Sequence, residues 1–226
     1  MIDTAGRYLR DDQSASEFSA FLRMLRKQRG KAAINGLVLV VSLPELLAAN
    51  SDERNALAAQ LVARVEEYAE CLDANPPVYL MLSKTDQLPG FSQAFDGLDL
   101  HERQQPLGMT FGLSEIRTNG LHAVLQTRLK KLQAHIRQHV DAQMIALGAE
   151  ADSTLLNFPQ YFAALSGVLE QFLDHFTRGH RGGAPLLLRG LYFTSALQNG
   201  QQLGQVYEDV IADEFALQAA YDEQAG

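Results

Sequence analysis

The stretch Val-Tyr-Leu-Met-Leu-Ser-Lys-Thr-Asp at residues 78–86 decides how the rest of the sequence is interpreted. Its first five residues form an apolar run typical of a buried strand. In open α/β sheets, ligands bind just beyond the carboxyl ends of the strands. A Lys-x-Asp there can hold a purine base, because the lysine stem packs on the base and the carboxylate accepts from ring N–H groups. Ser83, Lys84 and Asp86 are therefore candidate base-binding residues, although lysine and aspartate are also common in loops.

The composition is that of a soluble globular protein of one large or two small domains. The 226 residues are 46% hydrophobic and 20% charged, with a net charge of −8. An acidic chain is a poor candidate for non-specific binding of nucleic acid or for adhesion to anionic lipid. The single cysteine excludes an internal disulfide and fits a reducing compartment. With no apolar run long enough to span a membrane and no signal pattern at the start, we expect a soluble, cytosolic chain.

Two further runs predict strands that flank this stretch in the sequence. Residues 37–41 are continuously apolar, as in a strand buried on both faces of a parallel sheet, and residues 186–194 form the last strand. Between residues 41 and 78 we expect a short helix from Pro44 and a longer helix capped by Ser51. Crossovers of this length imply parallel pairing.

Helical periodicity accounts for most of the remaining sequence. A capping box over residues 14–17 opens a helix at 14–29 with a basic end, and long stripes predict antiparallel helices at 121–140 and 158–176. A last helix is expected at 203–215, and residues 108–113 form a brief extended piece. His135 and His139 lie one turn apart, but without a third ligand nearby we interpret them as the polar flank of a bundle helix rather than a metal site.

The two ends of the chain add residues with nucleotide-binding character. In Asp3-Thr4-Ala5-Gly6, Asp3 would hold Mg²⁺ and the Gly6 N–H would approach a terminal phosphate; a simple turn is the alternative interpretation. Ser195 and Ala196 end the last strand. The segments 3–6, 83–86 and 195–196 follow one another in the same order as the DxxG, [N/T]KxD and SA-type motifs of Ras-like GTPases. A GxxxxGK[ST] phosphate loop does not occur, because Gly30-Lys31 is followed by Ala32.

Together, these sequence segments resemble the IcmF/TssM family of type VI secretion. The resemblance rests on residues 3–8, 35–43, 77–86 and 188–195, in the same order along the chain. It implies an incomplete Ras-like α/β fold, a parallel sheet whose first strand and phosphate loop are missing, joined to an α-helical segment. Residues 1–113 would belong to the NTPase-like domain, 114–180 to a helical bundle, and 181–226 to the last strand and helix. Whether 114–180 is an insertion or a separate subdomain stays open.

The resemblance also implies a function and a location. The chain would be a cytoplasmic piece of an inner-membrane protein, docking to the cytoplasmic domain of the other inner-membrane subunit and to the baseplate. GTP or ATP with Mg²⁺ is expected only in a longer parent, and none in this chain alone; no catalytic residue is assigned. Ser83 replaces the usual Asn or Thr, and Arg7 stands where Ras-like enzymes place a water-orienting Gln. An active NTPase is the alternative function, and an unrelated α/β enzyme has no motif in its favour.

A missing first strand has a further structural consequence. The strand at 37–41 would be an exposed apolar edge, open to self-association with a second copy. Residues 1–8 would be displaced from the position of a sheet strand.

Overall fold

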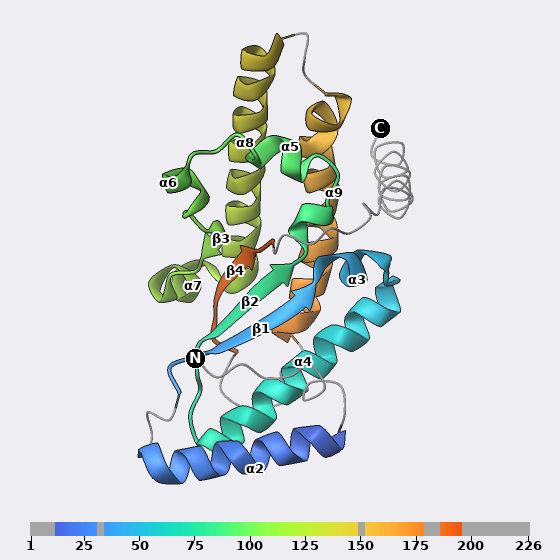
Figure 1. The fold of residues 1–226 in the computed structure, drawn as a ribbon. Helices are drawn as coiled ribbons and strands as arrows, with labels where there is room; N and C mark the ends of the chain where they lie inside the picture. The colour runs from blue at the N-terminus through green and yellow to red at the C-terminus, as the bar shows by residue number, and fades with distance from the viewer. Residues whose placement is uncertain (1–11, 31–33, 149–151, 179–185, 196–226) are drawn as a thin grey trace.

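A computed structural model describes residues 12–30, 34–148, 152–178 and 186–195 and shows a mixed α/β fold (Figure 1). Its four-stranded sheet has the order β1-β2-β4-β3. The strands are β1 (Leu37–Ser42), β2 (Val78–Ser83), β3 (Leu107–Thr110) and β4 (Leu188–Phe193). The helices are α2 (Asp12–Arg29), α3 (Leu43–Ala48), α4 (Ser51–Leu72), η2 (Thr85–Gln87), α5 (Phe91–Phe95), α6 (Leu100–Arg103), α7 (Leu113–Asn119), α8 (Leu121–Leu147) and α9 (Ser153–Arg178).

The three strands expected from apolar runs are confirmed, and they pair in parallel. β2 lies between β1 and β4, with Leu39 opposite Leu80 and Leu80 opposite Leu191. The expectation of an all-parallel sheet is wrong at one edge, where β3 pairs antiparallel with β4. β3 begins one residue before the segment 108–113 that was expected to be extended, and it overlaps the first part of that segment. The predicted helix at 203–215 and residues 1–8 lie outside the described residues.

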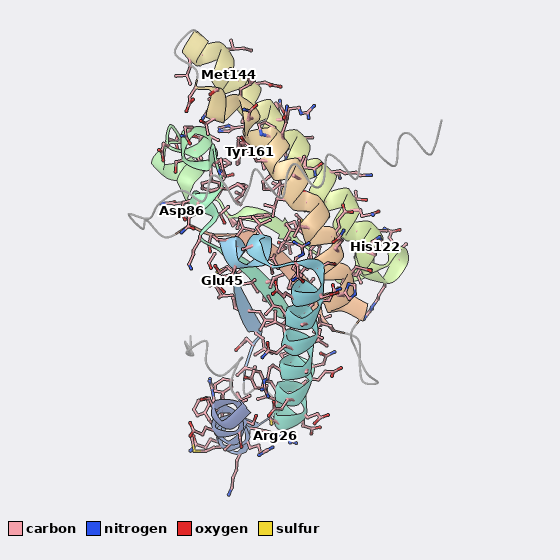
Figure 2. All side chains as sticks on the ribbon, turned by 90° about the vertical axis from the view of Figure 1, so that its right-hand side faces the viewer. Arg26, Glu45, Asp86, His122, Met144 and Tyr161 are labelled. Carbon is pink, nitrogen blue, oxygen red and sulfur yellow. The ribbon has the colours of Figure 1, made fainter. Side chains whose placement is uncertain are left out.

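The sheet is buried on one face, which corrects the expectation for the first strand. Leu39 and Val41 are buried, whereas Val38 and Val40 are 54% and 53% exposed. The same alternation continues in β2, where Val78, Leu80 and Leu82 are buried and the residues between them are half-buried. In Figure 2, α4, α8 and α9 lie on one side of the strands, so only the side chains that point to that side are covered.

The core lies between this covered face and the long helices. α4 and α9 pack against each other, and α8 lies beside α9 as the other arm of an antiparallel pair (Figure 1). The aromatic stripe of α9 is core, as its spacing predicts: Phe158, Phe162, Phe172 and Phe176 are all fully buried. Among the described residues, no helix combines the length and the apolar character needed to cross a membrane.

A smaller cluster fixes α2 against the C-terminal half of α4. It joins Leu22 to Tyr68, Cys71 and Leu72, and the ring of Phe18 meets that of Tyr68 edge-on at 5.1 Å. Burial raises the pKa of Tyr68 to about 12, with a further contribution from the nearby carboxylate of Glu67.

The helix ends differ in detail from those expected. α2 begins at Asp12, before the predicted capping box, and Gly30 follows it in the left-handed region at φ 69°. The cap of α4 is Asn50 rather than Ser51: its side chain accepts from the N–H of Glu53, whose carboxylate accepts from the Asn50 N–H in return. α8 and α9 both extend beyond their predicted ranges.

Helix α5 is held against α8 and α9 by a tight turn at Gly90, which has φ 82°. A methyl group at Gly90 would lie 2.5 Å from the carbonyl oxygen of Thr154 and 2.7 Å from Cβ of Phe158. His139 Nε2 lies 2.7 Å from the carbonyl oxygen of Ala94, and its ring stacks on Phe95. His139 thus packs α8 onto α5, and the described residues gather no cluster of metal ligands.

Candidate functional site

The candidate site lies at the carboxyl ends of β1, β2 and β4. The N–H of Thr194 donates to the carbonyl oxygen of Leu82 at 2.8 Å, and the N–H of Thr85 donates to the carbonyl oxygen of Thr194 at 3.1 Å. These two bonds join the turn after β2 to the residues after β4. They bring the Ser83–Asp86 turn beside Ser195, as expected if the carboxyl ends of parallel strands meet at one edge. Asp3, Gly6 and Ala196 lie outside the described residues, so their roles stay predictions.

Thr85 is the structural centre of this junction, and sequence reasoning did not single it out. Its side chain is fully buried. Its hydroxyl lies 3.1 Å from the carbonyl oxygen of Thr194 and 3.2 Å from that of Leu82, so it can donate to either. No local pattern marks this role, because Thr194 is 109 residues away in sequence.

The turn itself depends on an unusual backbone conformation at Lys84. Its φ of 61° and ψ of 34° are left-handed, a region that costs an ordinary side chain roughly 1–2 kcal/mol. The carbonyl of Lys84 accepts from the N–H of Gln87 at 3.1 Å, and that of Thr85 from the N–H of Leu88 at 3.0 Å. These bonds and the buried Thr85 hold the strained residue in place.

Asp86 is one of several described residues with a buried polar atom that has no hydrogen-bond partner. Its Oδ1 atom is buried and has no hydrogen-bond partner among the described residues. A buried polar atom without a partner costs about 1–3 kcal/mol, so this oxygen requires a donor from water or a ligand. The Oγ atom of Ser42, at the tip of β1, is in the same state, and Ser42 is the register partner of Ser83.

The ammonium group of Lys84 faces a carboxylate that the sequence analysis missed. Nζ of Lys84 lies 3.9 Å from Oε1 of Glu45, in the first turn of α3. Both side chains are well exposed, so the pair adds little to stability. The usable signal was the position of Glu45, directly after Pro44 at the carboxyl end of the neighbouring strand. Glu45 therefore offsets the charge of Lys84 at the rim of the site.

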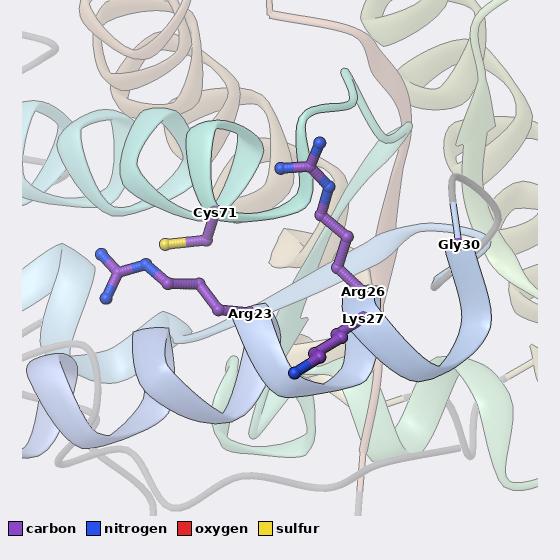
Figure 3. Close-up of a pocket in the computed structure, with 5 residues that line it drawn as sticks. All are labelled: Arg23, Arg26, Lys27, Gly30 and Cys71. Atoms are coloured by element: carbon purple, nitrogen blue, oxygen red, sulfur yellow. The ribbon is translucent and has the colours of Figure 1, made fainter.

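A pocket lies away from the strand tips. This pocket of about 410 Å³ is lined by Arg23, Arg26, Lys27, Gly30 and Cys71, where the end of α2 meets α4 (Figure 3). Nη2 of Arg26 lies 2.6 Å from Oδ2 of Asp73, at the end of α4. Of these residues, Arg26 and Lys27 lie in the last turn of α2, where they complement the helix dipole.

The fold and its strand tips define a mixed α/β domain with a candidate ligand site at the carboxyl edge of its sheet. The chain belongs to the family described as the IcmF-related N-terminal domain, which it matches over residues 11–226. It is 36% identical over 216 residues to the type VI secretion system component TssM1 of Pseudomonas aeruginosa. That alignment covers 91% of this chain and 19% of the relative, so the chain spans about a fifth of its length. No solved structure matches the chain. The membership inferred from the sequence is therefore confirmed.

Proposed function

We propose that the chain is a docking module of a type VI secretion component and that its strand tips are the base-binding side of an incomplete nucleotide site. The observation that carries this proposal is the Ser83–Asp86 turn at the carboxyl edge of the sheet, in a chain of this family. An incomplete Ras-like arrangement is the fold that fits the proposal. The sheet order is consistent with it, with β1, β2 and β4 as its last three parallel strands.

The chemistry of the tips supports base binding more than phosphate binding. Asp86 offers an unpartnered acceptor, which suits the N–H groups of a purine. Lys84 is the nearest cation, and Glu45 opposes its charge. The sequence also lacks the GxxxxGK[ST] loop whose backbone N–H groups and lysine hold phosphates. A site of this kind lacks the groups that drive phosphoryl transfer.

The docking role places the module at the cytoplasmic side of the bacterial inner membrane. Its expected partners are the cytoplasmic domain of the second inner-membrane subunit and the baseplate. A further partner is a second copy of the chain, since β1 has one edge that no described residue pairs with. Sedimentation at rising concentration tests this last point: we expect a shift towards a dimer, and an unchanged monomer over a hundredfold range contradicts it.

Calorimetric titration of the full chain with GTP and with ATP, each with Mg²⁺, tests the incomplete site. We expect no binding tighter than about 1 mM, because the energy of phosphate binding is missing. Micromolar binding of either nucleotide overturns the proposal. The Asp86→Asn variant is the matched control in that case, since it tells whether any heat comes from binding at the strand tips.

Hydrolysis of GTP or ATP by the longer protein is the alternative function. In that case Asp3 would hold Mg²⁺, and the N–H of Gly6 would approach the terminal phosphate. The observation in its favour is again the unpartnered Oδ1 of Asp86. In the longer protein, Asp86→Ala abolishes secretion if nucleotide turnover drives assembly and leaves it intact if the domain only docks. Asp141→Ala, which removes an exposed carboxylate on α8, is the control for a general effect of lost charge.

A further inference from the structure

The pocket between α2 and α4 has a cationic lining that the proposed function does not use. Arg23, Arg26 and Lys27 of α2 line it together with Gly30 and with Cys71 of α4, and none of these residues carries a carboxylate. The stretch 23–29 contains four lysine or arginine residues and no acidic residue, although the whole chain has a net charge of −8. The pocket is therefore a local positive region on an acidic protein.

Only one of the three lining cations is paired within the described residues. Nη2 of Arg26 lies 2.6 Å from Oδ2 of Asp73. In the part of the chain that the structure describes, no ion pair or side-chain hydrogen bond joins Arg23 or Lys27 to another residue, and both side chains are exposed. Two cations at the pocket therefore keep their full capacity to bind an anion.

The two helix ends account for part of this positive charge. Both α2 and α4 end at the pocket, and the carboxyl end of a helix carries roughly half a negative charge. Together with the carboxylate of Asp73, these ends supply about two negative charges. The lining offers three cations, and Arg29 adds a fourth in the same turn of α2. A positive surplus of about one to two charges therefore remains after the helix ends and Asp73 are neutralised.

The shape and chemistry of the pocket suit a phosphate group. Its volume is about 410 Å³, and Gly30 leaves one side open, since nothing lies within 4 Å of a Cβ added there. A guanidinium group matches two phosphate oxygens with two parallel N–H donors, and an ammonium group adds a compact charge. We propose that this pocket binds a dianionic phosphate group through Arg23 and Lys27, while Asp73 holds Arg26 beside it.

The thiol of Cys71 tests the proposal in the unmodified full chain, because it is the single cysteine. Cys71 is 5% exposed and points from α4 towards α2 (Figure 3). A phosphate group in the pocket blocks a neutral maleimide, so labelling slows by a factor of one plus the ratio of free phosphate to its dissociation constant. A dissociation constant of about 2 mM would slow labelling roughly tenfold in about 20 mM inorganic phosphate. Sodium chloride at equal ionic strength is the reference and should leave the rate unchanged.

Charge-removing variants assign the protection to the pocket. The double variant Arg23→Gln/Lys27→Gln should lose it. The matched control Lys130→Gln/Lys131→Gln removes the same charge from exposed positions on α8 and should keep it. If Cys71 labels too slowly to follow, phosphate should raise the urea midpoint of the starting chain and of the control but not of the double variant. Equal effects of phosphate and chloride, or protection that persists in the double variant, overturn the proposal.

Vesicle binding distinguishes the two sources of such a phosphate group. The full chain is sedimented with phosphatidylcholine vesicles that contain phosphatidic acid, whose headgroup is a phosphomonoester. Because the chain as a whole is acidic, we expect no sedimentation, which together with phosphate protection of Cys71 assigns the pocket to a soluble ligand. Sedimentation that inorganic phosphate and the double variant both abolish assigns it to a lipid headgroup. Sedimentation without phosphate protection of Cys71 overturns the proposal.

Discussion

Replacing Thr85 by valine tests whether its buried hydroxyl joins the tips of β2 and β4. The hydroxyl can donate to the carbonyl oxygen of Thr194 or of Leu82. Each of these oxygens keeps a backbone donor in the variant, the N–H of Thr85 and the N–H of Thr194 respectively. No buried acceptor is orphaned, so Thr85→Val should lower the free energy of unfolding by about 1 kcal/mol, the net value of one hydrogen bond.

The alanine variant separates the hydroxyl from the methyl group. Thr85→Ala also removes a methyl group from a fully buried position. That adds about 1 kcal/mol for lost transfer energy and the cavity, so the total should be about 2 kcal/mol. For a chain of this size, the melting temperature should fall by roughly 2–4 °C in Thr85→Val and by twice that in Thr85→Ala.

Urea unfolding followed by circular dichroism measures both values. Ser83→Ala is the control, because the Ser83 hydroxyl is half-buried and its contact with the carbonyl oxygen of Val41 is long, at 3.3 Å; its loss should stay within about 0.5 kcal/mol. The slope of the free energy of unfolding against urea concentration should not change, because the variants keep the same fold. A Thr85→Val variant as stable as the starting chain, or one that loses more than about 3 kcal/mol, refutes the assigned role.

Three further predictions concern stability. Gly90→Ala should cost more than about 2 kcal/mol in urea unfolding, because a left-handed backbone adds to a steric clash, whereas Gly30→Ala, left-handed but with open space around it, should cost about 1 kcal/mol; equal losses contradict the packing at Gly90. Asn50→Ala should lower the free energy of unfolding by about 1 kcal/mol, and Ser51→Ala should change it by no more than about 0.5 kcal/mol. A larger loss in Ser51→Ala than in Asn50→Ala would indicate that Ser51 is the cap of α4, as the sequence predicts. The raised pKa of Tyr68 means that its stabilising effect is fully present below pH 10 and is lost as the pH rises towards about 12, so the urea midpoint should fall more steeply there than in Tyr68→Phe; parallel curves contradict this.

The sequence predicts a strand correctly where an apolar run and the order of elements along the chain point to the same structure. The apolar runs of β1 and β2 are separated by a helix-length crossover, which leaves parallel pairing as the simple solution. β3 is different, because Leu-Gly-Met-Thr has no clear alternation. It becomes a strand through its partner: the N–H of Phe111 donates to the carbonyl oxygen of Arg189, and the register continues along β4. Contacts across such distances in sequence leave no periodic trace.

The residues of the candidate site could also be predicted only in part. Ser83, Lys84, Asp86 and Ser195 could be placed together, because each stands just after an expected strand of one sheet. The ion pair between Lys84 and Glu45 depends on the direction that α3 takes after β1, and the sequence does not specify this direction. Nucleotide binding by these residues stays a prediction, since the arrangement supplies an acceptor at Asp86 and leaves phosphate recognition unaccounted for.

The wrong expectation for β1 carries the most information about the docking role. A continuously apolar strand usually means that both faces are covered, yet the described helices cover one. The sequence nonetheless keeps valine at both outward positions, Val38 and Val40, where a solvent-facing strand would alternate with polar residues. Apolar residues at such positions are typical of a face that is covered in the intact protein.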